Sequence, residues 1–427
     1  MTYWCEQAWL PGGIARGVRI DVSDGQITAV VPDSPRTGSV LSGLTVPGFA
    51  NGHSHAFHRA LRGRTHHERG TFWTWRERMY ALASRLDPES YYRLARGVYA
   101  EMVLGGYTSV GEFHYLHHAP GGKPYTDPNA MGEALRQAAA DAGIRLTLLD
   151  TCYLAGGIGV EPDEVQRRFS DGSASAWAAR VAEVKEAGLF RVGAAIHSVR
   201  AVPADQLSLV DSARVVHVHL SEQRAENEQC LAAYGRTPTE LLHERGVLTD
   251  RLVAVHATHL TASDIERLSV ARACFCPTTE RDLGDGIGPA RALRDAGCRL
   301  SIGSDSNAVI DAFEETRALE LDDRLASEER GRFTAEELLA AGTDHAAVGW
   351  PEVGSLSVGR GADFVTVGLD SVRTAGIEPS GVLFAASSAD VRHVVVAGRE
   401  VVRDGAHQLI ERPETLLAKE IEALWQS

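Results

Sequence analysis

The chain has 427 residues, of which 44% are hydrophobic and 23% charged, the composition of a soluble globular protein with a sizeable core. No stretch approaches the ~18 consecutive apolar residues of a membrane span, so we expect no membrane partner. The 43 lysines and arginines stand against 57 acidic residues, and this net charge of −14 would repel nucleic-acid phosphates. Nucleic acid is therefore not an expected partner.

The two ends of the chain share a β-hairpin pattern. Residues 18–31 alternate β-branched and polar side chains around Asp24-Gly25, and residues 391–405 do the same around Ala397-Gly398. Because chain termini often lie close together, we expect residues 1–48 and 351–427 to form one small β-sandwich module. A closing helix is expected over 413–425. The first residues lack a basic segment followed by an apolar one, so a cytoplasmic location is expected.

The middle of the chain, residues 49–350, alternates short apolar runs with longer amphipathic stretches. This alternation is typical of repeated β-then-α units around a parallel sheet. The expected strands are 44–52, 108–113, 144–151, 191–196, 214–220, 252–256, 273–277 and 299–303. The expected helices include 87–105, 129–142, 174–187, 237–244, 263–268 and 290–296. Eight strands of this kind predict an α/β protein with a (β/α)8 TIM-like barrel.

Metal- or proton-handling residues follow several of these strands. His53 and His55 are two apart on the first strand, so their imidazoles project to the same face. The fifth strand ends in His219 and Glu222, the sixth in His256, and the eighth in Asp305. In a barrel the catalytic groups sit at the carboxyl ends of different strands, so these residues are expected to meet at one mouth.

The motifs HSH, HVHLSE, VHATH and GSDS, in this order, resemble the amidohydrolase superfamily, and in particular its branch with a single metal. That resemblance implies His53, His55, His219 and Asp305 as the metal ligands. The binuclear branch uses a carbamylated lysine from the fourth strand, whereas this strand ends Ala-Ile-His with no lysine nearby. One zinc ion per subunit is expected, and the ligand types suit iron as well.

The chemistry expected of this set is hydrolysis. Zinc would lower the pKa of a bound water to about 7 and so supply hydroxide at neutral pH. Glu222 would carry a proton between that water and a leaving nitrogen. His256 would orient the water or polarise the substrate, and Asp305 counts as both ligand and catalytic residue. The set suits attack on an sp² carbon that bears nitrogen, with ammonia expelled.

Other polar or sulfur-bearing residues have structural interpretations. His217 and His259 are expected in the core or around the ligands, and Cys274 and Cys276 as buried strand residues. A further group of histidines lies in polar, loop-like sequence and is expected to be solvated. This group comprises His66, His67, His117 and His118.

Arginines near the expected mouth indicate the substrate. Arginine binds carboxylates with two parallel hydrogen bonds. Two arginines together with a tyrosine and a histidine therefore favour a small dicarboxylate as the substrate. The segments FWTWRE, EFHYLHH, HSVR, HSHAF and LGDGI resemble the superfamily's deiminases of formimino dicarboxylates. That resemblance implies that the substrate is held by Arg76, Tyr115, His197 and Arg200. It also implies a contact at His58, where such proteins carry Gln. The same substrate with an altered pH dependence is expected, and a related formimino or amidino compound is the alternative.

Several alternatives remain at this stage. A deaminase of purine, pterin or cytosine-like rings could use the same metal site, but such flat substrates give paired arginines less to bind. A barrel without catalysis, used as a scaffold, would not need the ligand set. Residues 121–127 and 156–173 are rich enough in Gly and Pro to be mobile lids or plain surface loops. A homodimer is expected because it is the commonest assembly.

Overall fold

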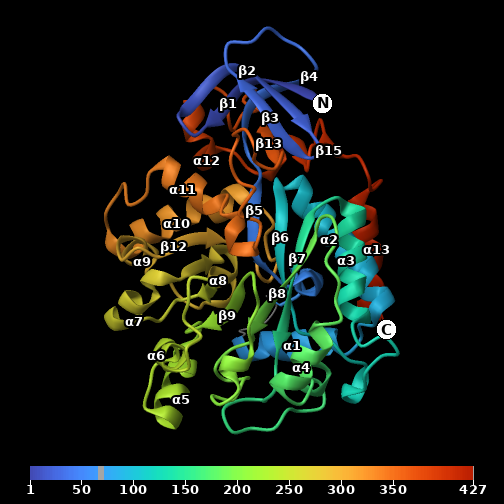
Figure 1. Ribbon diagram of the computed structural model, residues 1–427, viewed down its shortest axis with the longest axis vertical. Helices are drawn as coiled ribbons and strands as arrows, with labels where there is room; N and C mark the ends of the chain where they lie inside the picture. Colours follow the sequence, from blue (N-terminus) through green and yellow to red (C-terminus); the bar gives the residue numbers. More distant parts are fainter. Residues whose placement is uncertain (66–71, 427) are drawn as a thin grey trace.

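The computed structural model describes residues 1–65 and 72–426 and contains the predicted barrel. Eight parallel strands pair in chain order, and a bridge between Ser54 and Asp305, just past the last strand, joins it to the first. Figure 1 shows the barrel below the sheet that carries β1 to β4, within residues 2–47. The strands are β5 (Phe49–Ser54), β6 (Tyr107–His114), β7 (Arg145–Cys152), β8 (Phe190–Ile196), β9 (Val216–Leu220), β10 (Leu252–His256), β11 (Arg272–Phe275) and β12 (Arg299–Ile302). The α/β barrel fold is confirmed.

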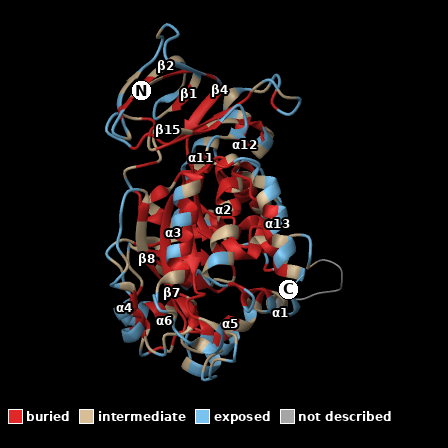
Figure 2. Ribbon diagram, turned by 90° about the vertical axis from the view of Figure 1, so that its right-hand side faces the viewer, coloured by how far each residue is buried: buried red, intermediate tan, exposed pale blue. Residues whose placement is uncertain are grey.

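The barrel strands are buried along almost their whole length (Figure 2). Every residue of β6 and β7 is buried, as expected for parallel strands covered on both faces. The helices are α1 (Phe72–Ala83), α2 (Pro88–Leu104), α3 (Ala130–Ala142), α4 (Ala174–Val181), α5 (Arg224–Tyr234), α6 (Pro238–Glu244), α7 (Ala262–Arg267), α8 (Pro277–Leu283), α9 (Ala290–Asp295), α10 (Ala312–Ser327), α11 (Ala335–Gly342), α12 (Val382–Ala385) and α13 (Pro413–Gln426). The helix expected over 174–187 ends earlier, at Val181. The residues beyond it are mostly exposed and give further turns little apolar surface to bury.

The strand expected over 44–52 is wrong, because two strands share this segment. β4 (Ser39–Pro47) belongs to the terminal module, and β5 begins the barrel at Phe49. A Cβ atom on Gly48 would overlap the side chain of Thr108, so glycine is the residue that fits at this crossing without a shift of Thr108. The apolar pattern runs through the crossing without a break, which is why the sequence did not reveal it.

The terminal module is one mixed eight-stranded sheet in the order β16-β15-β14-β13-β4-β1-β2-β3. Its remaining strands are β1 (Thr2–Leu10), β2 (Gly13–Ser23), β3 (Gln26–Val31), β13 (Phe364–Val367), β14 (Val391–Val396), β15 (Arg399–Arg403) and β16 (Ala406–His407). Both predicted hairpins are present, and the two residues of each turn have positive φ, as type I′ turns require. The sheet folds over a core shared by both chain ends, where Tyr3 and Phe364 meet edge to face at 5.1 Å. This agrees with the predicted sandwich.

Helix α13 packs on the barrel rather than on the terminal module (Figures 1 and 2). Arg93 of α2 donates to Glu420 at 2.8 Å, and the indole of Trp425 donates to the carbonyl of Ala60 at 2.9 Å. The carboxyl end of the chain therefore braces the segment that follows β5. Among residues 1–65 and 72–426, no helix has the length and apolarity needed to cross a membrane.

Candidate metal centre and substrate pocket

The four residues predicted as metal ligands converge at the carboxyl ends of β5, β9 and β12. Nε2 of His53 lies 3.1 Å from Nε2 of His219 and 3.3 Å from Oδ1 of Asp305. Nε2 of His55 lies 3.4 Å from the same Asp305 oxygen. All four side chains are buried, so one ion between them would be shielded from bulk water.

The donor set fits a divalent cation. Nδ1 of His55 lies 2.9 Å from the carbonyl of Phe113, a contact that fixes the proton on Nδ1 and presents the lone pair of Nε2 inward. Burial lowers the pKa of His53 to about 3 and that of His55 to about 4, so both imidazoles are neutral. Burial alone would raise the pKa of Asp305, but His53, His256 and His55 together hold it well below its ordinary value. Burial also lowers the pKa of His219 well below its ordinary value, and three neutral imidazoles with one carboxylate are ligands that zinc ordinarily takes.

The backbone around this centre is strained. His256, Ala257, Asp305 and Asn307 all have positive φ, a conformation that residues other than glycine rarely adopt. Asn307 donates to the carbonyl of His55 at 3.0 Å, so a side-chain hydrogen bond supports the strained segment. Strain of this kind persists where the surrounding structure fixes it, and it clusters at functional sites.

His256 and Glu222 stand next to the four predicted ligands. Nε2 of His256 lies 3.8 Å from Oδ2 of Asp305 and 3.9 Å from Oε1 of Glu222. Its Nδ1 lies 3.4 Å from the buried carboxylate of Glu280, a residue that the sequence analysis missed. Burial alone would lower the pKa of His256, but Glu222, Glu280 and Asp305 together raise it well above its ordinary value.

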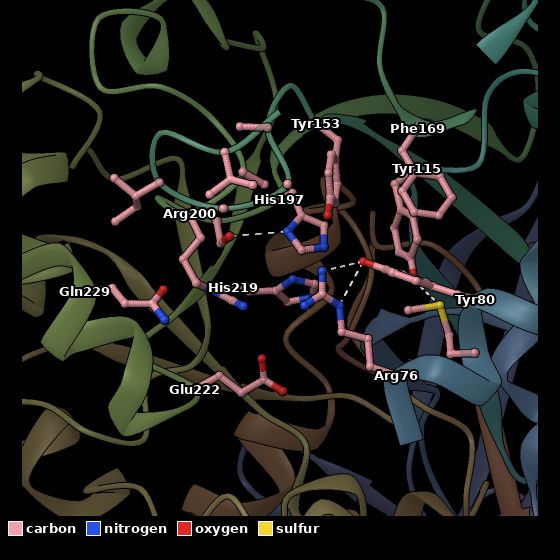
Figure 3. A pocket seen from close by; sticks show the side chains of 18 of the residues that line it. Arg76, Tyr80, Tyr115, Tyr153, Phe169, His197, Arg200, His219, Glu222 and Gln229 are labelled. Carbon is pink, nitrogen blue, oxygen red and sulfur yellow. Dashed lines mark hydrogen bonds between the residues drawn. The ribbon is translucent and has the colours of Figure 1, made fainter. Parts of the chain in front are cut away.

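A cavity of about 560 Å³ opens over this centre, and its walls carry every residue predicted to bind substrate. Figure 3 shows several of them, with Arg76 on one side of the cavity and Arg200 and Glu222 on the other. The predicted site residues in its lining are His55, His58, Arg76, Tyr115, His197, Arg200, His219, Glu222, His256 and Asp305. The structure thus brings the predicted site together in one place.

Both arginines are held by residues that the sequence did not single out. Nε and Nη2 of Arg76 donate to the hydroxyl of Tyr80 at 2.8 and 2.6 Å. Nε of Arg200 lies 3.6 Å from Oε2 of Glu226, which is fully buried in α5. Tyr80 lies four residues after Arg76 on α1, and such helical spacing was the one available signal.

His58 contacts substrate-facing residues of the cavity. Its Nε2 lies 2.9 Å from the hydroxyl of Tyr115. Burial lowers the pKa of His58 well below its ordinary value, so His58 stays neutral at physiological pH. An altered pH dependence near neutrality is therefore not expected from this side chain, in contrast to the expectation from sequence.

The expectation that His117 and His118 are solvated is wrong, because both are buried. Nε2 of His117 lies 2.9 Å from the carbonyl of Thr151, and Nε2 of His118 lies 3.0 Å from Asp171. The carbonyl oxygen of Arg168 accepts hydrogen bonds from the backbone N–H groups of His117 and His118. These bonds hold the segment after β6 against the protein interior. His66 and His67 lie outside the described residues.

The remaining histidines, cysteines and loops that the sequence analysis discussed differ in burial. His217 is buried, with Nε2 2.8 Å from the carbonyl of Ala347, and Cys274 and Cys276 are both buried. His259 lies further out, at intermediate exposure. Residues 121–127 are mostly exposed, whereas the segment 156–173 contributes to the cavity wall and contains a buried turn.

Imidazoles and a carboxylate at the carboxyl ends of the strands of an eight-stranded barrel are the arrangement found in barrel enzymes. The model of the amidohydrolase family matches residues 44–401, and the chain belongs to this family. Formimidoylglutamate deiminase of Pseudomonas aeruginosa is 40% identical over 96% of this chain and 96% of its own length.

Two solved structures have the same fold as this chain. The crystal structure of an amidohydrolase from Brucella melitensis has a TM-score of 0.90 and 33% identity, and the match covers 99% of each chain. An adenosine deaminase from Xanthomonas campestris with bound zinc has a TM-score of 0.84 and 21% identity over 100% of this chain and 98% of its own. The second likeness concerns the fold alone.

Proposed function

We propose that this chain hydrolyses N-formimino-L-glutamate to N-formyl-L-glutamate and ammonia. The observation that carries the proposal is the placement of Arg76 and Arg200 in the walls of one cavity above the His and Asp cluster. The relative from Pseudomonas aeruginosa, named a formimidoylglutamate deiminase, supports this activity. A substrate with two carboxylates and a formimino carbon would use both parts of the cavity.

We further propose that His53, His55, His219 and Asp305 hold one zinc ion. The neutral imidazoles and the ionised Asp305 fit such an ion, and a zinc-bound structure exists among the fold neighbours. Zinc at this position would lower the pKa of a coordinated water and polarise the formimino group. Iron is compatible with the same donors.

The substrate is held through its charges. Arg76 and Arg200 bind the two carboxylates, because a guanidinium offers paired N–H donors that match a carboxylate. Tyr115, His58 and His197 line the same cavity, and in this proposal they orient the chain that carries the formimino group. Binding through two carboxylates places the formimino carbon next to Glu222.

Glu222 moves the protons. It accepts one proton as the water oxygen bonds to the formimino carbon, and delivers it to the terminal nitrogen, which becomes an amino group. It then accepts the second proton from the new hydroxyl group and delivers it to the same nitrogen. The bond from the carbon to this nitrogen breaks as the carbonyl forms, ammonia departs, and the carboxylate ends the cycle as it began. His256, held by Glu280 at 3.4 Å, orients the reacting groups from the side of Asp305.

Replacement of Arg200 tests the dicarboxylate against the ring-deaminase alternative. In Arg200→Met we expect kcat/KM for N-formimino-L-glutamate to fall about tenfold to a hundredfold, the value of hydrogen bonds to a charged group. Metal content should stay at that of the wild type, and Arg236→Met, on an exposed arginine, should be neutral. Unchanged turnover in Arg200→Met, or turnover of a flat heterocycle in preference to the dicarboxylate, would contradict the proposal.

A further inference from the structure

Gln166 lies buried behind the substrate cavity, in the short 3-10 helix η3 (Gln166–Phe169). Its Nε2 donates to the hydroxyl of Tyr153 at 2.8 Å and to that of Tyr80 at 3.1 Å. Its Oε1 accepts from the backbone N–H of Asp163 at 2.9 Å. Because a backbone N–H can only donate, this contact fixes the orientation of the amide and turns its two donors toward the tyrosines.

The two tyrosines connect Gln166 to two residues that line the cavity, Arg76 and His197. The hydroxyl of Tyr80 accepts from Nε and Nη2 of Arg76, so Gln166 is separated from this guanidinium by a single side chain. The ring of Tyr153 packs against that of His197, with 4.4 Å between ring centroids. Figure 3 shows Tyr80, Tyr153, Arg76 and His197 facing the same space. One amide thus links α1 to the strand ends of β7 and β8.

The turn that carries Gln166 is itself fixed to α1. The buried guanidinium of Arg168 donates to the carbonyls of Leu86 at 2.7 Å and His118 at 2.9 Å, and also to the carbonyl of Ala83. The ring of Phe169 contacts those of Tyr115 and Tyr153 at centroid distances of 5.1 and 5.3 Å. The turn and α1 therefore form one connected wall, and Gln166 supplies its hydrogen bonds to the tyrosines of the cavity.

We propose that Gln166 is a positioning residue that fixes the guanidinium of Arg76, through Tyr80, for binding of a substrate carboxylate. This inference rests on the proposed function, in which Arg76 binds a carboxylate. Without the amide, the hydroxyl of Tyr80 loses one of its donors and is no longer fixed to η3, so part of the ordering of Arg76 must take place when a ligand binds. Because the carboxylate is remote from the formimino carbon, the loss falls on binding and leaves the chemical step almost unchanged.

The direct test uses glutarate, a dicarboxylate that cannot react, and isothermal titration calorimetry on the zinc-loaded protein. We expect Gln166→Met and Tyr80→Phe each to weaken glutarate binding about fivefold to tenfold, the value of a net hydrogen bond. The double variant should bind no more weakly than the weaker single variant, because both changes break the same chain. Gln137→Met, on an exposed glutamine of α3 bonded to Asp141, is the matched control and should bind as the wild type does.

Three results would overturn the inference: additive losses in the double variant, wild-type affinity in Gln166→Met, or no glutarate binding by the wild type. If Gln166→Met does not unfold cooperatively, Tyr80→Phe decides alone, and wild-type affinity in that variant overturns the inference.

Kinetics separate this inference from the proposed function. With N-formimino-L-glutamate we expect KM of Gln166→Met to rise about fivefold to tenfold, with kcat within about twofold of the wild type. A wild type that binds glutarate with the predicted dependence on Gln166 but does not turn over N-formimino-L-glutamate refutes the function and leaves the positioning role intact. A wild type that turns it over, with KM unchanged in Gln166→Met, refutes the positioning role alone.

Discussion

At the scale of single residues, sequence spacing identified side chains at strand ends better than side chains in loops. His53 and His55 are two apart after an apolar run, so their shared direction followed from strand geometry. His117 and His118 lie in a polar segment, and nothing local showed that the carbonyl of Arg168 would draw them inward. Gln166 was missed for the same reason, since its partners come from distant parts of the chain.

Glu222 provides the sharpest prediction for a single side chain. Glu222→Gln keeps the size of the side chain but cannot accept a proton, so kcat should fall about a hundredfold to ten-thousandfold. Zinc content, measured by atomic emission, should remain that of the wild type, because Glu222 is not among the four proposed ligands. A variant with near wild-type kcat would show that another group moves the proton.

Replacement of His58 tests whether the cavity accepts another polar side chain at this position. In His58→Gln we expect kcat/KM for N-formimino-L-glutamate to stay within about tenfold of the wild type, because a neutral amide can replace the neutral imidazole at the hydroxyl of Tyr115. The pH profile near neutrality should not move. Abolished activity at wild-type metal content would mean that the imidazole has a specific role.

At the scale of elements, periodicity predicted the eight barrel strands, because parallel strands read as continuous apolar runs. It could not show where β4 ends and β5 begins, since the residues on both sides of Gly48 are buried. The early end of α4 was likewise invisible to local propensity. These features depend on tertiary packing, which overrides local preference.

Helix α4 is fixed to the barrel by a network of ion pairs, and the contribution of this network to stability depends on pH. Arg180 donates to both oxygens of Asp150 at 2.8 and 2.9 Å and to both oxygens of Asp171, each at 2.9 Å. Burial alone would raise the pKa of Asp150, but Arg180 and His117 outweigh it and lower the pKa to about 2. Asp150 therefore contributes stability that is fully present above its unfolded pKa near 4 and is lost as the pH falls through about 2.

We expect Arg180→Met to lower the free energy of unfolding at pH 7 by about 3 to 5 kcal/mol, because it removes the positive charge that pairs with the buried Asp150 and the half-buried Asp171. The difference from the wild type should shrink as the pH is lowered from 7 toward 3, where the carboxylates become protonated. Urea unfolding at several pH values measures this, and Arg236→Met, on an exposed arginine, is the control. If the difference in unfolding free energy between the wild type and Arg180→Met did not change with pH, the ion pairs of Arg180 would not be its cause.

At the scale of the whole molecule, the pairing of the two chain ends followed from their shared hairpin pattern. The order of strands did not, because it depends on β4 pairing in parallel with β1 and antiparallel with β13, more than 300 residues away. Arg145 of β7 forms paired hydrogen bonds, each 2.9 Å, with Asp363, which immediately precedes β13. This buried contact links the barrel to the terminal module, and no sequence pattern pointed to it. A homodimer stays a prediction.

The central claim is that the barrel mouth deiminates a formimino dicarboxylate. The direct measurement is incubation of the zinc-loaded protein with N-formimino-L-glutamate, with ammonia followed over time and the carbon product identified by mass. The proposed function predicts ammonia and N-formyl-L-glutamate in equal amounts. Formamide with glutamate would mean that the other carbon–nitrogen bond is cut, and absence of turnover by the metal-bound protein would contradict the proposed function itself.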